Sequence, residues 1–213
     1  MIKVNEIFKS LQGESSYMGL PCVFIRLTGC NLRCDWCDTQ YAYEVGEEYT
    51  TEQIISAIEI FDIKLVEFTG GEPLLQKDEL IPIMEHLLSK DYKILLETNG
   101  SISIKDIPEE VVKIIDIKLK GSGEGDTFFT DNLNLIQKKD EIKFVLSSIF
   151  DYNQMKDIIK KNHLEVDKSI LVSRVFGSEI TDEQIAEKLL EDGLTVRYQI
   201  QLHKLIWGNK EGK

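Results

Sequence analysis

Three of the four cysteines lie close together, in the segment 30–37, which reads CNLRCDWC. Cys30, Cys34 and Cys37 are separated by three and then two residues, so one loop can direct their thiolates at one object. Three thiolates can bind three irons of a cubane iron–sulfur cluster and leave the fourth iron without a protein ligand. A small molecule could then bind that iron directly. The residues also allow a zinc site, which usually takes four Cys or His ligands, or ordinary structural or redox thiols.

The fourth cysteine, Cys22, lies in the apolar run 22–27, which contains β-branched and aromatic residues. Such a run predicts a buried strand, and Cys22 is predicted to pack there rather than to bind a metal. Arg26 interrupts the run, and a buried arginine needs an anionic partner. That partner is either a carboxylate of the protein or a carboxylate-bearing ligand, and the sequence leaves both open.

Four further segments combine glycine with polar side chains: 10–16 (SLQGESS), 70–73 (GGEP), 97–100 (ETNG) and 118–123 (KLKGSG). Each of them alone could be a simple turn, because glycine and asparagine adopt unusual backbone dihedrals. Asp38 and Thr39 follow the cysteine loop and carry hard oxygen atoms, which suit magnesium more than iron. An Asp-led turn is the plainer interpretation of this pair. His203 is predicted at the end of the last strand, where a lone histidine is usually structural or solvated.

The charge balance and the apolar runs limit the partners of this chain of 213 residues. Asp and Glu total 37 against 25 Lys and Arg, a formal charge of −12, which would repel a polyanion such as tRNA. No apolar run approaches the ~20 residues of a membrane span, and residues 1–6 lack the apolar core of a secretory signal. We therefore expect a cytoplasmic protein with a single domain over residues 1–213 and no direct contact with nucleic acid or membrane.

The spacing of the apolar residues predicts strands and helices that alternate along the chain. Strands are expected at 4–8, 22–27, 65–69, 94–97, 114–119, 142–146, 170–175 and 196–202, and helices at 51–61, 80–88, 108–113, 133–138, 152–161 and 182–191. This order is typical of an α/β fold with about six parallel βα units after an amino-terminal strand. An open doubly wound sheet and an incomplete (β/α) barrel both remain possible, because a complete barrel takes about 250 residues. In either fold, the polar segments at the strand ends are expected to meet at one mouth.

The Cys-x3-Cys-x2-Cys loop resembles the signature of the radical S-adenosylmethionine (SAM) enzymes, and GGEP resembles their second motif, whose backbone approaches the SAM ammonium. The resemblance implies a partial (β/α) barrel and a [4Fe-4S] cluster on Cys30, Cys34 and Cys37, with SAM chelating the open iron. It also implies a reducing partner such as flavodoxin or ferredoxin. An electron from the reduced cluster would cleave SAM to a 5′-deoxyadenosyl radical, which abstracts a substrate hydrogen.

Four segments together are similar to one family within that superfamily, the 7-carboxy-7-deazaguanine synthases: 10–14 (SLQGE), 24–27 (FIRL), 34–39 (CDWCDT) and 202–208 (LHKLIWG). This resemblance implies conversion of 6-carboxy-5,6,7,8-tetrahydropterin to 7-carboxy-7-deazaguanine with loss of ammonia, a step towards queuosine and other 7-deazapurines. It also implies magnesium as a cofactor and a homodimer. Two alternatives of other classes are a glycyl-radical activating enzyme and a zinc-stabilised binding module.

The resemblance further assigns roles to individual residues. SAM is expected to contact Trp36, Asp38, Gly71, Ser122 and Lys118, and Thr39 is expected to bind magnesium. The pterin is expected to contact Leu11, Gln12, Gly13, Glu14, Arg26, Thr69 and His203. The tail 209–213 is short and charged and gives no match to the family.

Overall fold

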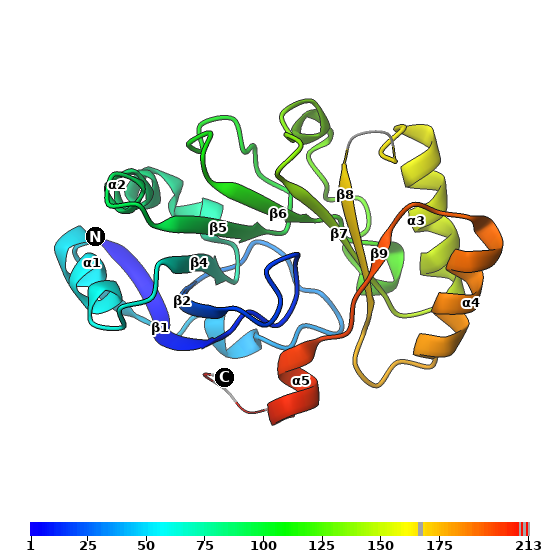
Figure 1. Ribbon diagram of the computed structural model, residues 1–213, viewed down its shortest axis with the longest axis horizontal. Coiled ribbons are helices and arrows are strands. Elements are labelled where there is room, and N and C mark those ends of the chain that lie inside the picture. Colours follow the sequence, from blue (N-terminus) through cyan, green and yellow to red (C-terminus); the bar gives the residue numbers. More distant parts are fainter. Residues whose placement is uncertain (166–167, 209, 211, 213) are drawn as a thin grey trace.

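The computed structural model describes residues 1–165, 168–208, 210 and 212, so most of the tail 209–213 lies outside the described residues. Nine strands of the described chain form one sheet in the order β3-β1-β2-β4-β5-β6-β7-β8-β9 (Figure 1). Their bounds are β1 (Ile2–Leu11), β2 (Pro21–Leu27), β3 (Glu47–Tyr49), β4 (Leu65–Gly70), β5 (Lys93–Thr98), β6 (Val112–Asp116), β7 (Glu141–Leu146), β8 (Ser169–Arg174) and β9 (Arg197–Tyr198).

The sheet is a partial (β/α) barrel. β1 runs antiparallel to its neighbours β2 and β3, whereas each pair from β2 to β9 is parallel. Within the described residues β3 and β9 form the two edges, so the barrel stays open between them. The expectation of an incomplete barrel with an added amino-terminal strand is therefore confirmed.

Four α-helices accompany the parallel strands, and a fifth follows β9: α1 (Thr51–Glu59), α2 (Lys77–Leu88), α3 (Ile149–Lys161), α4 (Asp182–Asp192) and α5 (Leu202–Trp207). The first four confirm predicted helices. Thr50, Ser148 and Thr181 cap α1, α3 and α4 by accepting a hydrogen bond from a backbone N–H of the first turn. None of the described helices is both long and apolar enough to cross a membrane.

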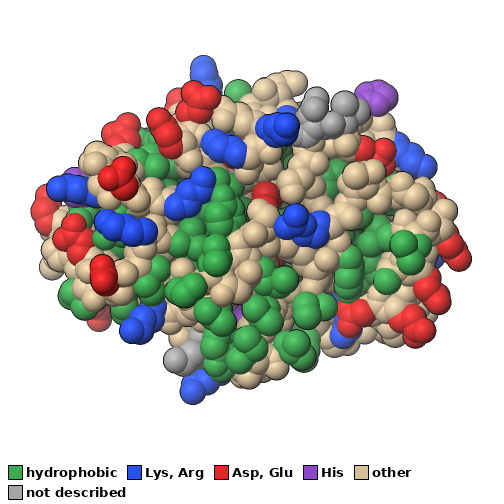
Figure 2. All heavy atoms as spheres, viewed as in Figure 1, with side chains coloured by type: hydrophobic (Ala, Val, Ile, Leu, Met, Phe, Trp, Pro, Cys, Tyr) green, Lys and Arg blue, Asp and Glu red, His purple; other side chains and the backbone are tan. Residues whose placement is uncertain are grey.

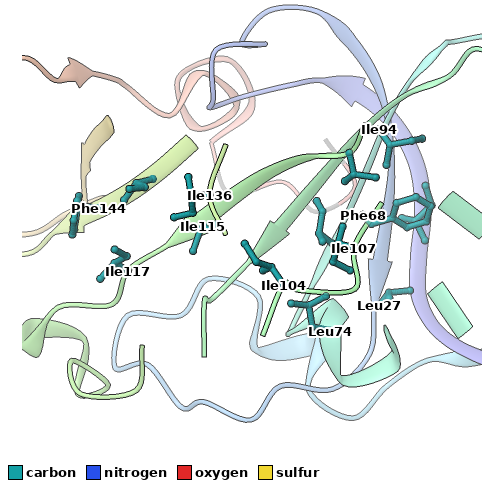
Figure 3. Packing of buried hydrophobic residues seen from close by; sticks show 14 of the residues in the cluster. Leu27, Phe68, Leu74, Ile94, Ile104, Ile107, Ile115, Ile117, Ile136 and Phe144 are labelled. Atoms are coloured by element: carbon teal, nitrogen blue, oxygen red, sulfur yellow. The ribbon is translucent and has the colours of Figure 1, made fainter. Parts of the chain in front are cut away.

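The main hydrophobic core lies between the strands and the helices. Consecutive strands contribute buried apolar side chains to it, including Leu27, Phe68, Ile94, Ile115 and Phe144 (Figure 3). Because side chains alternate along a strand, the neighbouring residues face the inside of the barrel. A smaller apolar cluster fills part of that inner side, and it consists of Cys22, Phe24, Leu65, Leu95, Val112 and Ile114. Cys22 is thus the buried strand residue that its apolar run predicted.

The predicted helix over 108–113 is wrong, because this segment is a turn that leads directly into β6. Pro108 is a suitable first residue for a helix, but Val111 and Val112 are β-branched and fully buried. The strand predicted at 114–119 accordingly begins two residues earlier, at Val112, and ends at Asp116.

The predicted helix over 133–138 is also wrong, since only a short 3-10 helix forms, at Thr130–Asn134. Asn132 is buried there and anchors the preceding loop. Its side chain accepts a hydrogen bond from the Ile104 N–H and donates to the carbonyls of Gly100 and Ile102. The β5–β6 and β6–β7 connections therefore cover the core with loop residues such as Ile104 and Ile136 instead of α-helices (Figure 3).

The last predicted strand, 196–202, is mostly wrong as well. Only Arg197 and Tyr198 pair with β8, and α5 begins at Leu202. The chain leaves the sheet because its polar groups bind the loop that follows β1. Gln199 donates its side-chain N–H to the Ser15 carbonyl, and the Leu202 N–H donates to the Gly13 carbonyl. His203 consequently lies in α5 and not at a strand end.

Candidate active site

A cavity of about 500 Å³ lies at the carboxyl ends of the parallel strands. Its volume falls within the range of small-molecule sites. Every residue that the sequence assigned to the site except Ser122 contributes to its wall: Leu11, Gln12, Gly13, Glu14, Arg26, Cys30, Cys34, Trp36, Cys37, Asp38, Thr39, Thr69, Gly71, Lys118 and His203. The expected convergence of the strand-end loops on one mouth is confirmed.

The cysteine loop after β2 is tied to three other strand-end loops. From the loop after β4, the Glu72 backbone N–H donates to the Gly29 carbonyl, at 2.7 Å. Asn31 donates its side-chain amide to Ser101 Oγ beyond β5, at 2.9 Å. The Asp35 N–H binds a carbonyl in the loop after β6 at 3.0 Å. These contacts place the three thiols at one side of the cavity.

Gly70 and Gly71 allow the β4 loop to approach the cysteine loop closely. Gly70 has a φ of +143°, a conformation that favours glycine. A Cβ built at Gly71 would overlap the Gly29 carbonyl oxygen and would lie 2.8 Å from Cys30 Cβ. A side chain at position 71 would therefore push the first cysteine out of place, which explains the glycine pair.

Glu72 joins the ends of β4 and β5. Its fully buried carboxylate accepts hydrogen bonds from the Thr98 hydroxyl at 2.8 Å, the Asn99 N–H at 2.7 Å and the Leu74 N–H at 2.9 Å. Burial raises the pKa of Glu72 to about 7, although these hydrogen bonds counteract the rise. Asn99 in turn places its side-chain amide 3.9 Å from Cys30 Sγ. Glu72 had no assigned role in the sequence, where GGEP could be a simple turn.

The three thiols suit an iron–sulfur cluster better than a single metal ion with a complete set of protein ligands. Burial raises the pKa of Cys30 and raises that of Cys34 to about 11, while the Lys118 ammonium opposes both shifts. Among the described residues, no group of three His, Cys, Asp or Glu side chains is arranged around one metal ion. The three thiolates of a cubane cluster bind separate irons, so they need not converge on one point. The donor set therefore fits a cluster.

Lys118 and Trp36 form the wall next to the cysteine loop. Lys118 Nζ lies 2.8 Å from Asp116 Oδ2 and 5.1 Å from the centre of the Trp36 ring. Trp36 Nε1 and Asp116 Oδ1 are buried and have no hydrogen-bond partner within the described chain. A buried donor and a buried acceptor without partners suit a polar ligand in the cavity.

The loop after β1 forms another part of the cavity wall and is fixed by polar contacts. Gln12 donates to Glu67 Oε2 at 2.7 Å, and its Oε1 accepts the Glu14 N–H at 2.6 Å. Lys143 forms ion pairs with both Glu14 and Glu97. Glu67 and Lys143 had no assigned role in the sequence, although each is a charged residue inside a largely apolar strand pattern. Glu97 belongs to the polar segment 97–100, which was expected at the mouth and does line the cavity.

Arg26 has a protein carboxylate as a partner and also lines the cavity. Its Nε donates to Glu6 Oε1 at 2.8 Å, and its guanidinium lies 5.8 Å from the centre of the Tyr41 ring. Of the two partners that the sequence left open for Arg26, a protein carboxylate or a ligand carboxylate, the protein carboxylate is therefore present. Since a guanidinium has five N–H donors, the ion pair with Glu6 leaves room for a ligand as well.

Ser122 is the one assigned residue that is not brought to the cavity. Its buried hydroxyl donates to the Leu119 carbonyl at 2.6 Å and accepts the Glu124 N–H at 3.2 Å. The serine instead supports the cysteine loop, because its carbonyl accepts the Asp35 N–H. A contact of Ser122 with SAM stays a prediction.

Fold and site together define a class of protein. A partial (β/α) barrel carries three cysteines at the mouth, and residues 24–187 match the family model described as "Radical SAM superfamily". The chain is therefore a radical SAM enzyme, a class that uses a [4Fe-4S] cluster and SAM and draws electrons from a reductant.

Similar proteins show to which family within this superfamily the chain belongs. The chain is 42% identical to the 7-carboxy-7-deazaguanine synthase of Koribacter versatilis, with 97% of each chain covered. It is 40% identical to the synthase of Clostridium acetobutylicum, over 99% of this chain and 98% of the relative. A crystal structure of QueE from Escherichia coli matches with a TM-score of 0.74 and 21% identity, covering 93% of both chains, and supports the fold. The chain belongs to the 7-carboxy-7-deazaguanine synthase family.

Proposed function

We propose that the chain converts 6-carboxy-5,6,7,8-tetrahydropterin to 7-carboxy-7-deazaguanine with release of ammonia, as a step in the biosynthesis of queuosine precursors. The observation that carries this proposal is the near full-length similarity to synthases of that name, combined with a single cavity that joins the cysteine loop to the Leu11–Glu14 loop. Nothing in the site favours a glycyl-radical activating enzyme or a zinc-stabilised module.

Cys30, Cys34 and Cys37 would hold the cluster, which supplies the electron that cleaves SAM when both are bound. We assign SAM to the wall formed by Trp36, Lys118, Asp38 and Gly71. The orphaned Trp36 Nε1 would donate to a polar atom of SAM, and the Lys118 ammonium would attract its carboxylate. The Gly71 backbone can approach closely because no Cβ intervenes.

The pterin would occupy the side of the cavity that is lined by Leu11–Glu14, Thr69 and His203. Arg26 would bind the substrate carboxylate with the N–H groups that Glu6 does not engage. Gln12, Glu14 and the loop carbonyls offer acceptors for the guanidine-like edge of the pterin. Burial lowers the pKa of His203, so its ring is neutral at pH 7 and can both donate and accept.

Magnesium would bind at Thr39, which lies on the cavity wall two residues after Cys37. Thr39 Oγ1 is 3.7 Å from Cys37 Sγ, and the neighbouring Asp38 carboxylate forms an ion pair with Lys204 at 3.1 Å. Magnesium commonly takes only one or two protein ligands and completes its shell with substrate and water. A hydroxyl at this place therefore fits the ion.

We further propose a cytoplasmic homodimer with a single domain in each copy. Figure 2 shows hydrophobic side chains gathered over α5, and the exposed apolar residues of this region are Leu205 and Ile206 in α5 and Ile200 just before it. Exposed apolar patches mark interaction surfaces, and we assign this one to a second copy of the chain. Light scattering of the wild-type protein and of Leu205→Lys tests the dimer: the variant should be monomeric.

The function is tested with anaerobically reconstituted protein, SAM, dithionite, magnesium and the carboxytetrahydropterin. Carboxydeazaguanine should accumulate over many turnovers, and Cys34→Ala, which lacks one cluster ligand, should contain little iron and form no product. A wild-type protein with a full cluster that cleaves SAM but never forms carboxydeazaguanine would contradict the proposal.

A further inference from the structure

Lys143 occupies the inner side of the barrel, at a place where two carboxylates meet. It extends from β7, and its Nζ lies 2.5 Å from Glu14 Oε2 and 2.5 Å from Glu97 Oε1. Its side chain is only 8% exposed. Glu97 belongs to β5, whereas Glu14 belongs to the loop after β1, so one ammonium connects this loop to two strands of the barrel wall.

The second oxygen of the Glu14 carboxylate is also engaged. Glu14 Oε1 accepts a hydrogen bond from Gln201 at 2.9 Å, so each oxygen of the Glu14 carboxylate has a partner. Lys143 is the only one of these partners that carries a charge opposite to that of Glu14. It therefore contributes both the direction and the electrostatic attraction that hold the Glu14 carboxylate at the cavity.

Glu14 and Glu67 both lie near Lys143, and the protein shifts their pKa values in opposite directions. Burial would raise the pKa of Glu14, but the Lys143 ammonium and its hydrogen bond hold it at about 2. The pKa of Glu67 is instead well above its usual range, because burial and the nearby Glu97 outweigh the hydrogen bond from Gln12. Glu14 is thus held in its ionised form, whereas burial and Glu97 disfavour the ionised form of Glu67 and raise its pKa.

We propose that Lys143 is a positioning residue for the substrate: by holding Glu14 against Glu97, it fixes the Leu11–Glu14 loop in the conformation that binds the pterin. This inference rests on the proposed function, because it takes the pterin as the occupant of that side of the cavity. Lys143 does not take part in SAM cleavage. Its loss should therefore weaken pterin binding without removing the cluster.

The test uses Lys143→Met combined with Glu97→Gln, so that the partly buried Glu97 is not left as an unpaired charge in the cavity. Lys143→Gln is measured beside it, since its amide can still donate a hydrogen bond and provides a second folded variant. For both, the Kd and the KM of the carboxytetrahydropterin should rise at least tenfold, and kcat should change less than KM. Lys143→Arg, which keeps the charge, should restore Kd to within about threefold of the wild-type value.

Lys113→Met is the matched control, because Lys113 is equally buried and paired with Asp140 at 3.4 Å but does not line the cavity. Iron content and circular dichroism report the fold of each variant. Wild-type Kd in either folded Lys143 variant, or equal weakening by Lys113→Met, would overturn the inference while leaving the function intact. A wild-type protein that neither binds nor converts the pterin would instead overturn the proposed function.

Discussion

The Glu72 carboxylate and the backbone N–H of Asn99 lie 2.7 Å apart, and this hydrogen bond joins the β4 loop to the β5 loop directly beneath the first cysteine. The carboxylate also accepts hydrogen bonds from the Thr98 hydroxyl and the Leu74 N–H. One buried side chain thus sets the spacing of two of the loops that surround the cluster site.

Glu72→Ala should destabilise the protein, because it leaves several buried donors without an acceptor. Each such donor costs about 1–3 kcal/mol, so we expect the free energy of unfolding to fall by roughly 3 kcal/mol or more. Urea denaturation of the cluster-free protein measures this change. Glu79→Ala, an exposed glutamate in the first turn of α2, is the control and should change the free energy by less than about 0.5 kcal/mol. Equal stability of both variants would contradict the assigned role.

Gly71→Ala should impair the assembly of the cluster more than the fold. The added methyl group would overlap the Gly29 carbonyl and press on Cys30, so the cysteine loop must move. We expect iron content and the absorbance of the cluster to fall after anaerobic reconstitution, with near-normal circular dichroism. Gly177→Ala is the comparison: at a φ of +81° the added Cβ strains the backbone but meets nothing within 4 Å, so this variant should lose some stability and keep its iron content. A full cluster in Gly71→Ala would show that the close approach is not required.

Arg26→Ala should weaken the turnover of the pterin while SAM cleavage without pterin continues. Loss of a charge-assisted contact to the substrate carboxylate should raise KM about 10- to 100-fold. Glu6→Gln separates the two roles of Arg26, because it removes the ion pair but keeps the guanidinium. If the pterin contact dominates, Glu6→Gln should retain most activity; if the variants lose activity equally, the ion pair with Glu6 is what matters.

The stability of the cluster-free protein should fall on acidification in part through Glu14. Its pKa is lowered in the folded state, to about 2, so its contribution is present above the ordinary pKa of a glutamate and is lost as the pH falls towards 2. Unfolding free energies measured between pH 6 and 3 should therefore decrease less steeply in Glu14→Gln than in the wild-type protein. Parallel curves would exclude a strong native ion pair with Lys143.

The sequence predicted the fold where hydrophobic spacing and local signals agree. The helices α1 and α4 each begin directly after a capping threonine, and β4 and β7 are apolar runs with clear boundaries. It failed where tertiary contacts decide, as at Asn132, whose buried side chain orders a loop that has helical spacing. No local pattern distinguishes such an asparagine from a solvated one.

In the candidate active site, too, the residues in local motifs were predicted and those that depend on tertiary contacts were not. The assigned residues form motifs that are contiguous in sequence, and nearly all of them line the cavity. Glu67 and Lys143 were missed because each lies within a strand and belongs to no motif, whereas Glu97 stands in the ETNG segment that was expected at the mouth. A charge within a buried parallel strand is itself a signal, since it requires a partner across the barrel. Which partner it finds depends on the register of the strands, as in the parallel pair β6–β7, and the sequence does not reveal that register.

The loop after β1 and the segment 199–203 meet across the open side of the barrel, through contacts that join residues as far apart as Glu14 and Gln201. Without the segment 199–203, the Ser15 carbonyl and Glu14 Oε1 lose the hydrogen bonds that Gln199 and Gln201 donate to them. During synthesis on a ribosome, the β4 and β5 loops can already form while this gap is still uncovered. The substrate pocket should therefore be among the last parts of the molecule to mature, and a nascent chain that still lacks β9 and α5 should be unable to retain its substrate.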